Sequence, residues 1–289
     1  MMMNLIAELS TGGKTPDGCK IGAPQKVIYQ CSEDGVSDTI KPRLERCGAD
    51  CRKIAFINEE VYNGLTLDDE RIRQAIIDSM NVIAVKTFTA ITPQLGYDYL
   101  KNFGFTTVVD REEITYGGNT YVYSDIQQST ALGGLTHGVT NEELNAAYAC
   151  IANGGTYVTP KLYTRVTDSD GNVILDNTNP PTRQVIKETT AFLLTSAMQD
   201  VVTSGTGGKV NFGGMAIAGK TGTTTGPTDA WFAGYTPYYT AATWTGYDNN
   251  VDLNSAADGV SKTLWRKVMK RVHEDLPNTQ FPVPSGIIQ

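Results

Sequence analysis

The chain has 289 residues and a net charge of −7, with 40% hydrophobic and 19% charged residues, which is an ordinary globular composition. A pI near 4.9 argues against nucleic acid as a partner, because phosphate binding needs a basic surface. No apolar run approaches the roughly 18 residues of a membrane span, and the opening residues show no secretion signal or anchor, so the cellular location is left unknown.

Residues 1–60 are polar and irregular, and within them only Lys26–Tyr29 predicts a strand. This segment holds four of the five cysteines, Cys19, Cys31, Cys47 and Cys51. They could form two disulfides or a zinc site, or remain four unrelated thiols, and only Cys47 and Cys51 show the close spacing of zinc ligands. The fifth, Cys150, falls in an apolar helical pattern and is interpreted as a small core residue.

After this segment the helical periodicity becomes clear. Thr66 and Asp69 resemble a capping box, and apolar residues at helical spacing lie on both sides of the polar stretch from Asp78 to Asn81. The stretch predicts a junction between two helices, where side chains face open space. A third helix is predicted over Leu95–Phe103.

The middle of the chain alternates hairpins and helices. Hairpins are predicted at Tyr116–Tyr121 and Val166–Leu175, and Thr140 with Glu143 forms a capping box for a helix over Asn141–Ala152. Two further helices are predicted over Glu188–Val202 and Ala256–Glu274. The last one carries an i,i+4 stripe of Val260, Leu264, Val268 and Val272.

Three apolar runs predict an antiparallel meander. Met215–Ala218 is interpreted as a buried strand that leads into a Lys-Thr-Gly segment, and Asp229–Thr236 and Tyr239–Gly246 predict two more strands. Gly222 leaves the edge of the first strand without a side chain, so another backbone can approach it. Helices precede and follow the meander, which predicts an α+β fold with an antiparallel sheet packed against helices.

Gly214–Thr221 also satisfies the phosphate-loop pattern G-x-x-x-x-G-K-[ST]. Such a loop needs a preceding strand and a following helix whose N-terminus faces the phosphate. Gly222, Gly226 and Pro227 disfavour a helix at that place. Nucleotide binding is therefore only a remote interpretation of this segment.

Ser79-Met80-Asn81 at the helix junction and Lys220-Thr221-Gly222 on the strand resemble two of the three signature motifs of penicillin-binding proteins and class A β-lactamases. The flanking sequence is similar to the transpeptidase domain of a class A, bifunctional penicillin-binding protein from about residue 61 to 282. On this basis residues 1–60 are an unmatched segment and residues 283–289 a tail. The segments that carry the likeness are Arg73–Lys86, Ala131–Gly134, Gly138–Thr140, Ala147–Tyr148, Ala152–Gly155, Ser204–Gly207, Ala218–Thr224 and Asp229–Pro237.

The resemblance implies the penicillin-binding/serine β-lactamase-like fold and acyl transfer on the D-alanyl-D-alanine stem peptides of peptidoglycan. It implies β-lactams as covalent mimics, a membrane-anchored extracytoplasmic parent protein, and neither cofactor nor metal. The only two histidines, His137 and His273, have no supporting ligand cluster in the sequence, which also disfavours a metal site.

The resemblance further implies a role for each matched residue. Ser79 corresponds to the serine that relays protons, and Asn81 to the amide that holds the substrate backbone. Lys220, a compact cation, would polarise the relay and attract the substrate carboxylate. The substrate-binding strand would be Thr221, Gly222, Thr223 and Thr224, with the Thr221 and Thr223 hydroxyls on the carboxylate and the Thr223 N–H in the oxyanion hole.

The first motif, S-x-x-K, whose serine is the family's nucleophile, is missing, because no serine of the chain is followed three positions later by lysine. The nearest form is Thr11-Gly12-Gly13-Lys14, whose glycines disfavour a rigid nucleophile. Two interpretations compete. The chain is either a truncated or mis-assembled copy of a D,D-transpeptidase, or a genuine non-catalytic module that binds peptidoglycan or acts as a scaffold. Both predict no stable acyl-enzyme with penicillin.

Overall fold

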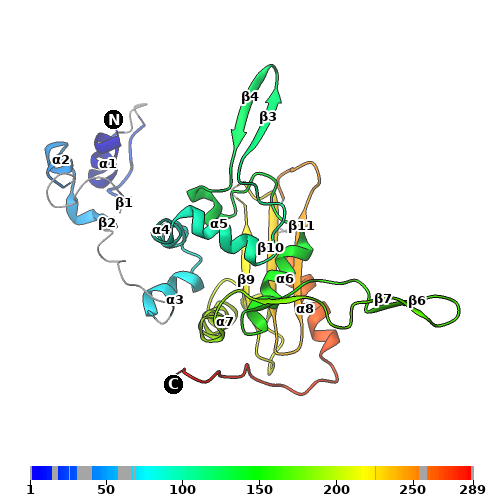
Figure 1. The fold of residues 1–289 in the computed structure, drawn as a ribbon. Coiled ribbons are helices and arrows are strands. Elements are labelled where there is room, and N and C mark those ends of the chain that lie inside the picture. Colours follow the sequence, from blue (N-terminus) through cyan, green and yellow to red (C-terminus); the bar gives the residue numbers. More distant parts are fainter. Residues whose placement is uncertain are drawn as a thin grey trace. The chain divides into compact units, whose positions relative to one another are not determined.

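The computed structural model describes residues 2–14, 19–25, 27–30, 41–57, 67, 69–224, 226–253 and 259–287. The chain forms two compact units, Met1–Thr66 and Leu67–Gln289, which are drawn together in Figure 1. The division into 1–60, 61–282 and 283–289 that the resemblance suggests remains a prediction.

The first unit is built on two parallel strands. β1 (Val27–Gln30) pairs with β2 (Ile54–Ile57), and α1 (Met2–Thr11) and α2 (Lys41–Arg46) contribute helices. Its core consists of Ile6, Leu44 and Ile54. The prediction that this segment is irregular apart from one strand is therefore wrong, because elements this short show too few periods of the apolar pattern to be recognised.

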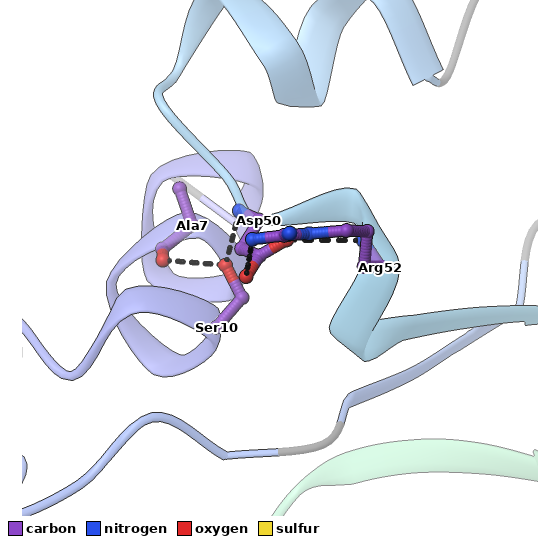
Figure 2. A network of polar contacts seen from close by, with 4 residues as sticks. All are labelled: Ala7, Ser10, Asp50 and Arg52. Atoms are coloured by element: carbon purple, nitrogen blue, oxygen red, sulfur yellow. Dashed lines mark hydrogen bonds and ion pairs between the residues drawn. The ribbon is translucent and has the colours of Figure 1, made fainter.

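A small polar network fixes α1 to the turn before β2 (Figure 2). The fully buried hydroxyl of Ser10 donates to the Ala7 carbonyl at 2.8 Å and accepts the N–H of Asp50 at 2.9 Å. The Asp50 carboxylate caps the 3-10 turn η2 (Cys51–Lys53) and accepts from Nε of Arg52 at 2.9 Å. Each buried polar group of this network thus has a partner, as burial requires.

The structure describes the state of only some of the cysteines for which disulfides, a zinc site or free thiols were considered. Cys47 and Cys51 are free thiols, and Cys31 lies outside the described residues. Within the described ranges, no group of three His, Cys, Asp or Glu side chains is placed to hold a metal ion. Cys150 is 1% exposed, which confirms it as a core residue, and burial raises the pKa of its thiol to about 11.

The second unit contains the predicted meander. β9 (Ala218–Thr223), β10 (Asp229–Tyr235) and β11 (Thr240–Gly246) form an antiparallel sheet in the order β11-β10-β9, which confirms the α+β fold. Either outer strand, β9 or β11, therefore has one edge that no strand of the described chain occupies.

The first strand begins later than the sequence predicts. Met215–Ile217 are buried but lie outside β9. Gly213 and Gly214 adopt left-handed conformations with φ of 79° and 78°, and the N–H of Ala216 donates to the Thr279 carbonyl instead of to a strand. The strand that carries Lys220, as predicted, therefore begins at Ala218 and not at Met215.

Helices cover both faces of this sheet. Because side chains alternate along a strand, Phe232 and Tyr235 of β10 face opposite ways. Phe232 packs against Trp265 with ring centroids 5.1 Å apart, and the Tyr235 hydroxyl bonds to that of Thr195 at 2.7 Å. The second unit contains the helices α3 (Glu70–Ile77), α4 (Asn81–Ile91), α5 (Pro93–Asn102), α6 (Asn141–Ala152), α7 (Glu188–Thr203) and α8 (Val260–Val272), of which α6, α7 and α8 pack against the sheet.

Most predicted helices are confirmed, with differences at their ends. Asp69 is the N-cap of α3, whereas Thr66 lies outside the described residues. In α8 the side chains buried against the sheet are Ser261, Trp265 and Met269, and the apolar i,i+4 stripe lies beside them, half-exposed. None of the helices in the described ranges combines the length and apolarity that a bilayer crossing demands.

Both predicted hairpins are confirmed, and a third strand pair was not predicted. The hairpins project from the second unit in Figure 1. The third pair packs beside α6, where Tyr157 is buried. The pairs are β3 (Glu112–Tyr116) with β4 (Asn119–Tyr123), β6 (Arg165–Thr167) with β7 (Val173–Asp176), and β5 (Thr156–Val158) with β8 (Thr182–Gln184).

Glu143 completes the capping box of α6 with Thr140 and also accepts from Thr106, at 2.7 Å from both its N–H and its hydroxyl. Burial alone would raise the pKa of Glu143, but these hydrogen bonds outweigh it and lower the pKa to about 2. A carboxyl whose pKa is lowered by folding stabilises the folded state at pH values above its pKa in the unfolded chain. It loses that contribution as the pH falls toward its pKa in the folded state.

We therefore expect Glu143→Gln to lower the free energy of unfolding most at neutral pH. The difference from the wild type should shrink as pH falls from 4.5 toward 2, because the wild-type carboxyl then becomes neutral as well. Urea unfolding at a series of pH values measures this. Glu142→Gln, at the exposed neighbouring position, is the control, and an equal effect in both variants would contradict the assignment.

Candidate active site

The junction between α3 and α4 presents Ser79 to solvent. α3 ends at Ile77 and α4 begins at Asn81, and between them Ser79 has a φ of 56°. A left-handed conformation is uncommon for a residue other than glycine and costs energy, and such residues cluster at functional sites. The turn is closed by the Met80 N–H, which donates to the Ala75 carbonyl at 2.9 Å.

Lys220 reaches this turn from β9. Its Nζ donates to Oγ of Ser79 at 2.6 Å and to the Thr221 carbonyl at 3.2 Å. The side chain is half-buried, and desolvation lowers the pKa of its ammonium group. Ser79 and Lys220, which are far apart in the sequence, are thus brought together, and the three donors of the ammonium point to the Ser79 hydroxyl and to the carbonyl and hydroxyl of Thr221.

The remaining predicted residues differ in how close they come to this pair. Thr221 is adjacent, with its hydroxyl 3.4 Å from Nζ of Lys220. Gly222 and Thr223 follow on β9, whose outer edge is open. The hydroxyl of Thr224 instead accepts the N–H groups of the 228–229 turn, so it is committed to local structure.

Asn81 is the first residue of α4 and is exposed. In the described structure no hydrogen bond joins its side chain to Ser79 or to Lys220. It lies two residues after Ser79, so it belongs to the same exposed junction. The roles suggested for Asn81, Thr223 and Thr224 remain predictions.

An ion pair links α3, the helix that precedes Ser79, to α7. Arg73 of α3 donates from Nε to the Asp200 carboxylate at 2.5 Å and from Nη1 to the Ser196 hydroxyl at 3.1 Å. Both acceptors belong to α7, which packs against β9. The helix that precedes Ser79 and the strand that carries Lys220 are therefore both packed against α7.

The loop Ser204–Gly207 contacts both α3 and β9. The sequence identifies it as one of the segments that carry the family likeness but assigns none of its residues to the site. Thr206 shares a hydrogen bond with the hydroxyl of Thr221 at 2.8 Å. A Cβ on Gly205 would lie 2.8 Å from the carbonyl of Ile77, two residues before Ser79. The signal in the sequence is the pair of glycines around a threonine, which permits close backbone approach on both sides.

We expect Gly205→Ala to displace the end of α3 and to destabilise the second unit by roughly 1–3 kcal/mol, as overpacking does. Gly208→Ala is the matched control. A Cβ there meets nothing closer than 3.9 Å, so its effect should stay within about 0.5 kcal/mol. Thermal unfolding of both variants measures the difference, and equal melting temperatures would refute the close packing.

Residues 53–270 match the family described as the penicillin binding protein transpeptidase domain. The chain belongs to this family. Among its relatives, penicillin-binding protein 1A of Clostridium botulinum is 36% identical over 232 residues, which are 79% of this chain and 26% of that protein. Penicillin-binding protein 2D of Bacillus subtilis is 32% identical over 236 residues, 78% of this chain and 31% of that protein. The chain thus spans about a quarter to a third of these relatives.

Solved penicillin-binding structures share the fold. PonA1 of Mycobacterium tuberculosis in complex with penicillin V gives a TM-score of 0.63 at 23% identity, over 75% of this chain and 60% of that one. The D,D-transpeptidase domain of a peptidoglycan glycosyltransferase from Eggerthella lenta gives 0.53 at 21% identity, over 70% of this chain and 52% of that one.

The phosphate-loop pattern has no counterpart in this penicillin-binding fold. Lys220 and Thr221 lie within β9, and the chain after Thr223 enters a turn and then β10. Among the described residues between Lys220 and β10 no helix begins, and a phosphate cradle requires a helix N-terminus there.

Proposed function

We propose that this chain binds the D-alanyl-D-alanine ends of peptidoglycan stem peptides at Ser79 and Lys220, without acyl transfer. The observation that carries the proposal is the 2.6 Å hydrogen bond from Lys220 to Ser79 beside the open edge of β9. A cation, two hydroxyls and an unpaired strand edge are what a peptide with a terminal carboxylate needs.

In the proposed complex the terminal carboxylate accepts from Lys220 and Thr221, and the peptide backbone adds a strand to β9. Ser79 already accepts a hydrogen bond from Lys220, so its own hydrogen is available to a ligand acceptor. β-Lactams carry a carboxylate beside an amide carbonyl, as the stem peptide does, and the family member PonA1 has been solved with penicillin V. We include them as ligands.

The absence of acyl transfer rests on the missing S-x-x-K serine. Thr11, the nearest substitute, is the last residue of α1, and its hydroxyl donates to the Ala7 carbonyl at 2.9 Å. A nucleophilic hydroxyl needs a neighbouring base to take its proton, and a backbone carbonyl is not one. The alternative function, D,D-transpeptidation by this chain, would require a nucleophile that the sequence does not offer in the family's pattern.

Isothermal titration with an Nα-acetyl-Lys-D-Ala-D-Ala peptide tests the proposal. We expect saturable binding that is weakened in the Ser79→Ala variant and is much weaker for the L-Ala-L-Ala diastereomer. Ser124→Ala, a change elsewhere in the second unit, is the control. Equal binding of the two diastereomers, or no binding at millimolar peptide, would refute the proposed function.

A further inference from the structure

Each hydrogen of the Lys220 ammonium group already points to an oxygen of the protein. The acceptors are Oγ of Ser79 at 2.6 Å, and the carbonyl and the hydroxyl of Thr221 at 3.2 Å and 3.4 Å. An ammonium has three donors and no more, so a ligand carboxylate that binds Lys220 must displace one of these acceptors. The contact with the Thr221 hydroxyl is the longest of the three, and hydrogen bonds weaken with length. It is therefore the contact that a carboxylate displaces most easily.

This displacement changes the hydrogen bonds of the Thr221 hydroxyl. A hydroxyl donates one hydrogen and accepts up to two. The Thr221 oxygen accepts from Lys220 and also shares a hydrogen bond of 2.8 Å with the hydroxyl of Thr206, in which either oxygen can be the donor. When a carboxylate takes the hydrogens of both Lys220 and Thr221, the 2.8 Å contact persists only if Thr206 supplies the hydrogen.

The side chain of Thr206 is able to make this change. It is exposed, and in the part of the chain that the structure describes its hydroxyl has the Thr221 hydroxyl as its one hydrogen-bond partner. The hydrogen of a threonine hydroxyl rotates to suit its partner. The hydrogen bond between the two threonines can therefore reverse its direction while the carbon and oxygen atoms stay in place.

The loop that carries Thr206 is held by its backbone and not by this hydroxyl. The N–H groups of Gly205 and Gly207 both donate to the Val201 carbonyl, at 3.2 Å and 2.9 Å. A Cβ on Gly205 would lie 2.8 Å from the Ile77 carbonyl, and a Cβ on Gly207 would lie 3.0 Å from the Val201 carbonyl. The loop is thus packed closely on the last turns of α3 and α7, so loss of the Thr206 hydroxyl should leave it in place.

We propose that Thr206 is a positioning residue of this site, and that its hydroxyl reverses the hydrogen bond with Thr221 when a carboxylate binds Lys220. In the free site Thr221 accepts from Lys220 and donates to Thr206. In the complex Thr206 donates to Thr221, which lets Thr221 and Lys220 donate to the same carboxylate. Hydroxyl hydrogens rotate, and no proton is transferred. The inference rests on the proposed function, because it concerns the carboxylate of the same ligand.

Isothermal titration of the full chain with the Nα-acetyl-Lys-D-Ala-D-Ala peptide tests this role. Thr206→Val replaces the hydroxyl by a methyl group and should weaken binding by roughly 3- to 10-fold, as loss of one hydrogen bond between neutral groups does. Thr206→Ser keeps a hydroxyl and should bind within about twofold of the wild type. Thr203→Val is the matched control, because the Thr203 hydroxyl is exposed and contacts only that of Ser204, at 3.4 Å.

A double-mutant cycle separates positioning from a structural effect on the loop. In a Thr221→Val background the hydroxyl that Thr206 serves is gone. Thr206→Val should then weaken binding by less than about twofold, because the two changes act on one interaction. A loop displaced by the valine would instead weaken binding equally in both backgrounds. Circular dichroism should show that all the variants fold as the wild type does.

The outcomes distinguish this inference from the proposed function. Unchanged affinity in Thr206→Val, an equal loss in both backgrounds, or no recovery in Thr206→Ser would overturn the role of Thr206 while peptide binding by the wild type stands. Absence of peptide binding by the wild type would refute the proposed function, and the inference with it.

Discussion

Trp265→Ala is expected to lower the free energy of unfolding of the second unit by roughly 3–5 kcal/mol, the usual cost of deleting a buried large aromatic side chain. Trp265 is fully buried and stacks edge-on against Phe232. Its indole N–H holds the Ala241 carbonyl of β11. The substitution therefore removes a core contact with β10 and the indole hydrogen bond that joins α8 to β11.

Trp244→Ala is the matched control for this prediction. Trp244 also donates a hydrogen bond from its indole, to Asp229 at 2.8 Å, but it is 36% exposed, so its loss should cost about 1 kcal/mol or less. The chain has three tryptophans, all in the second unit, so fluorescence during urea unfolding reports on that unit alone. Similar midpoints for the two variants would contradict the placement of the core.

Lys220→Met is expected to weaken binding of the D-Ala-D-Ala peptide by roughly 10- to 100-fold, because hydrogen bonds between charged partners contribute about 1.5–3 kcal/mol. Methionine keeps most of the length of the side chain and removes its charge. Titration calorimetry on both proteins measures the change. Lys209→Met, which removes an exposed cation from η5 (Gly208–Val210), is the control for the loss of net charge and should leave the affinity unchanged.

The pH dependence gives the same prediction a second readout. Desolvation lowers the pKa of Lys220, so its ammonium loses its proton at a lower pH than an exposed lysine would. Carboxylate binding should therefore decline with rising pH before the usual lysine range is reached, and the decline should be absent in Lys220→Met. A wild-type affinity that stays constant through that range would mean that Lys220 does not contact the carboxylate.

The parts of this structure that the sequence predicts are those with local signals. The helix junction at Ser79 and the Lys-Thr-Gly strand follow from apolar periodicity and from motif resemblance, and the capping box at Thr140 follows from two residues three positions apart. Each depends on a few neighbouring positions, so tertiary contacts do not override it. The likeness to penicillin-binding transpeptidases follows from the same short sequence segments.

Other features depend on contacts between distant residues, which no local pattern encodes. The left-handed φ of Ser79 is set by the ends of two helices, and Thr206 gains its role only because its loop meets both Ile77 and Thr221. In α8 the most regular apolar stripe is not the buried face. Trp265 fits the sheet and Ser261 binds Thr243 through its carbonyl, so shape and hydrogen bonding decide which side is covered.

The measurement that tests the central claim most directly is the intact mass of the chain after incubation with benzylpenicillin, with noncovalent binding followed in parallel by competition against the D-Ala-D-Ala peptide. The account predicts competition without any covalent adduct, because Ser79 and Lys220 hold the ligand and no S-x-x-K serine attacks it. A stable adduct of one benzylpenicillin per chain would contradict it, and loss of that adduct in Thr11→Ala would identify the nucleophile.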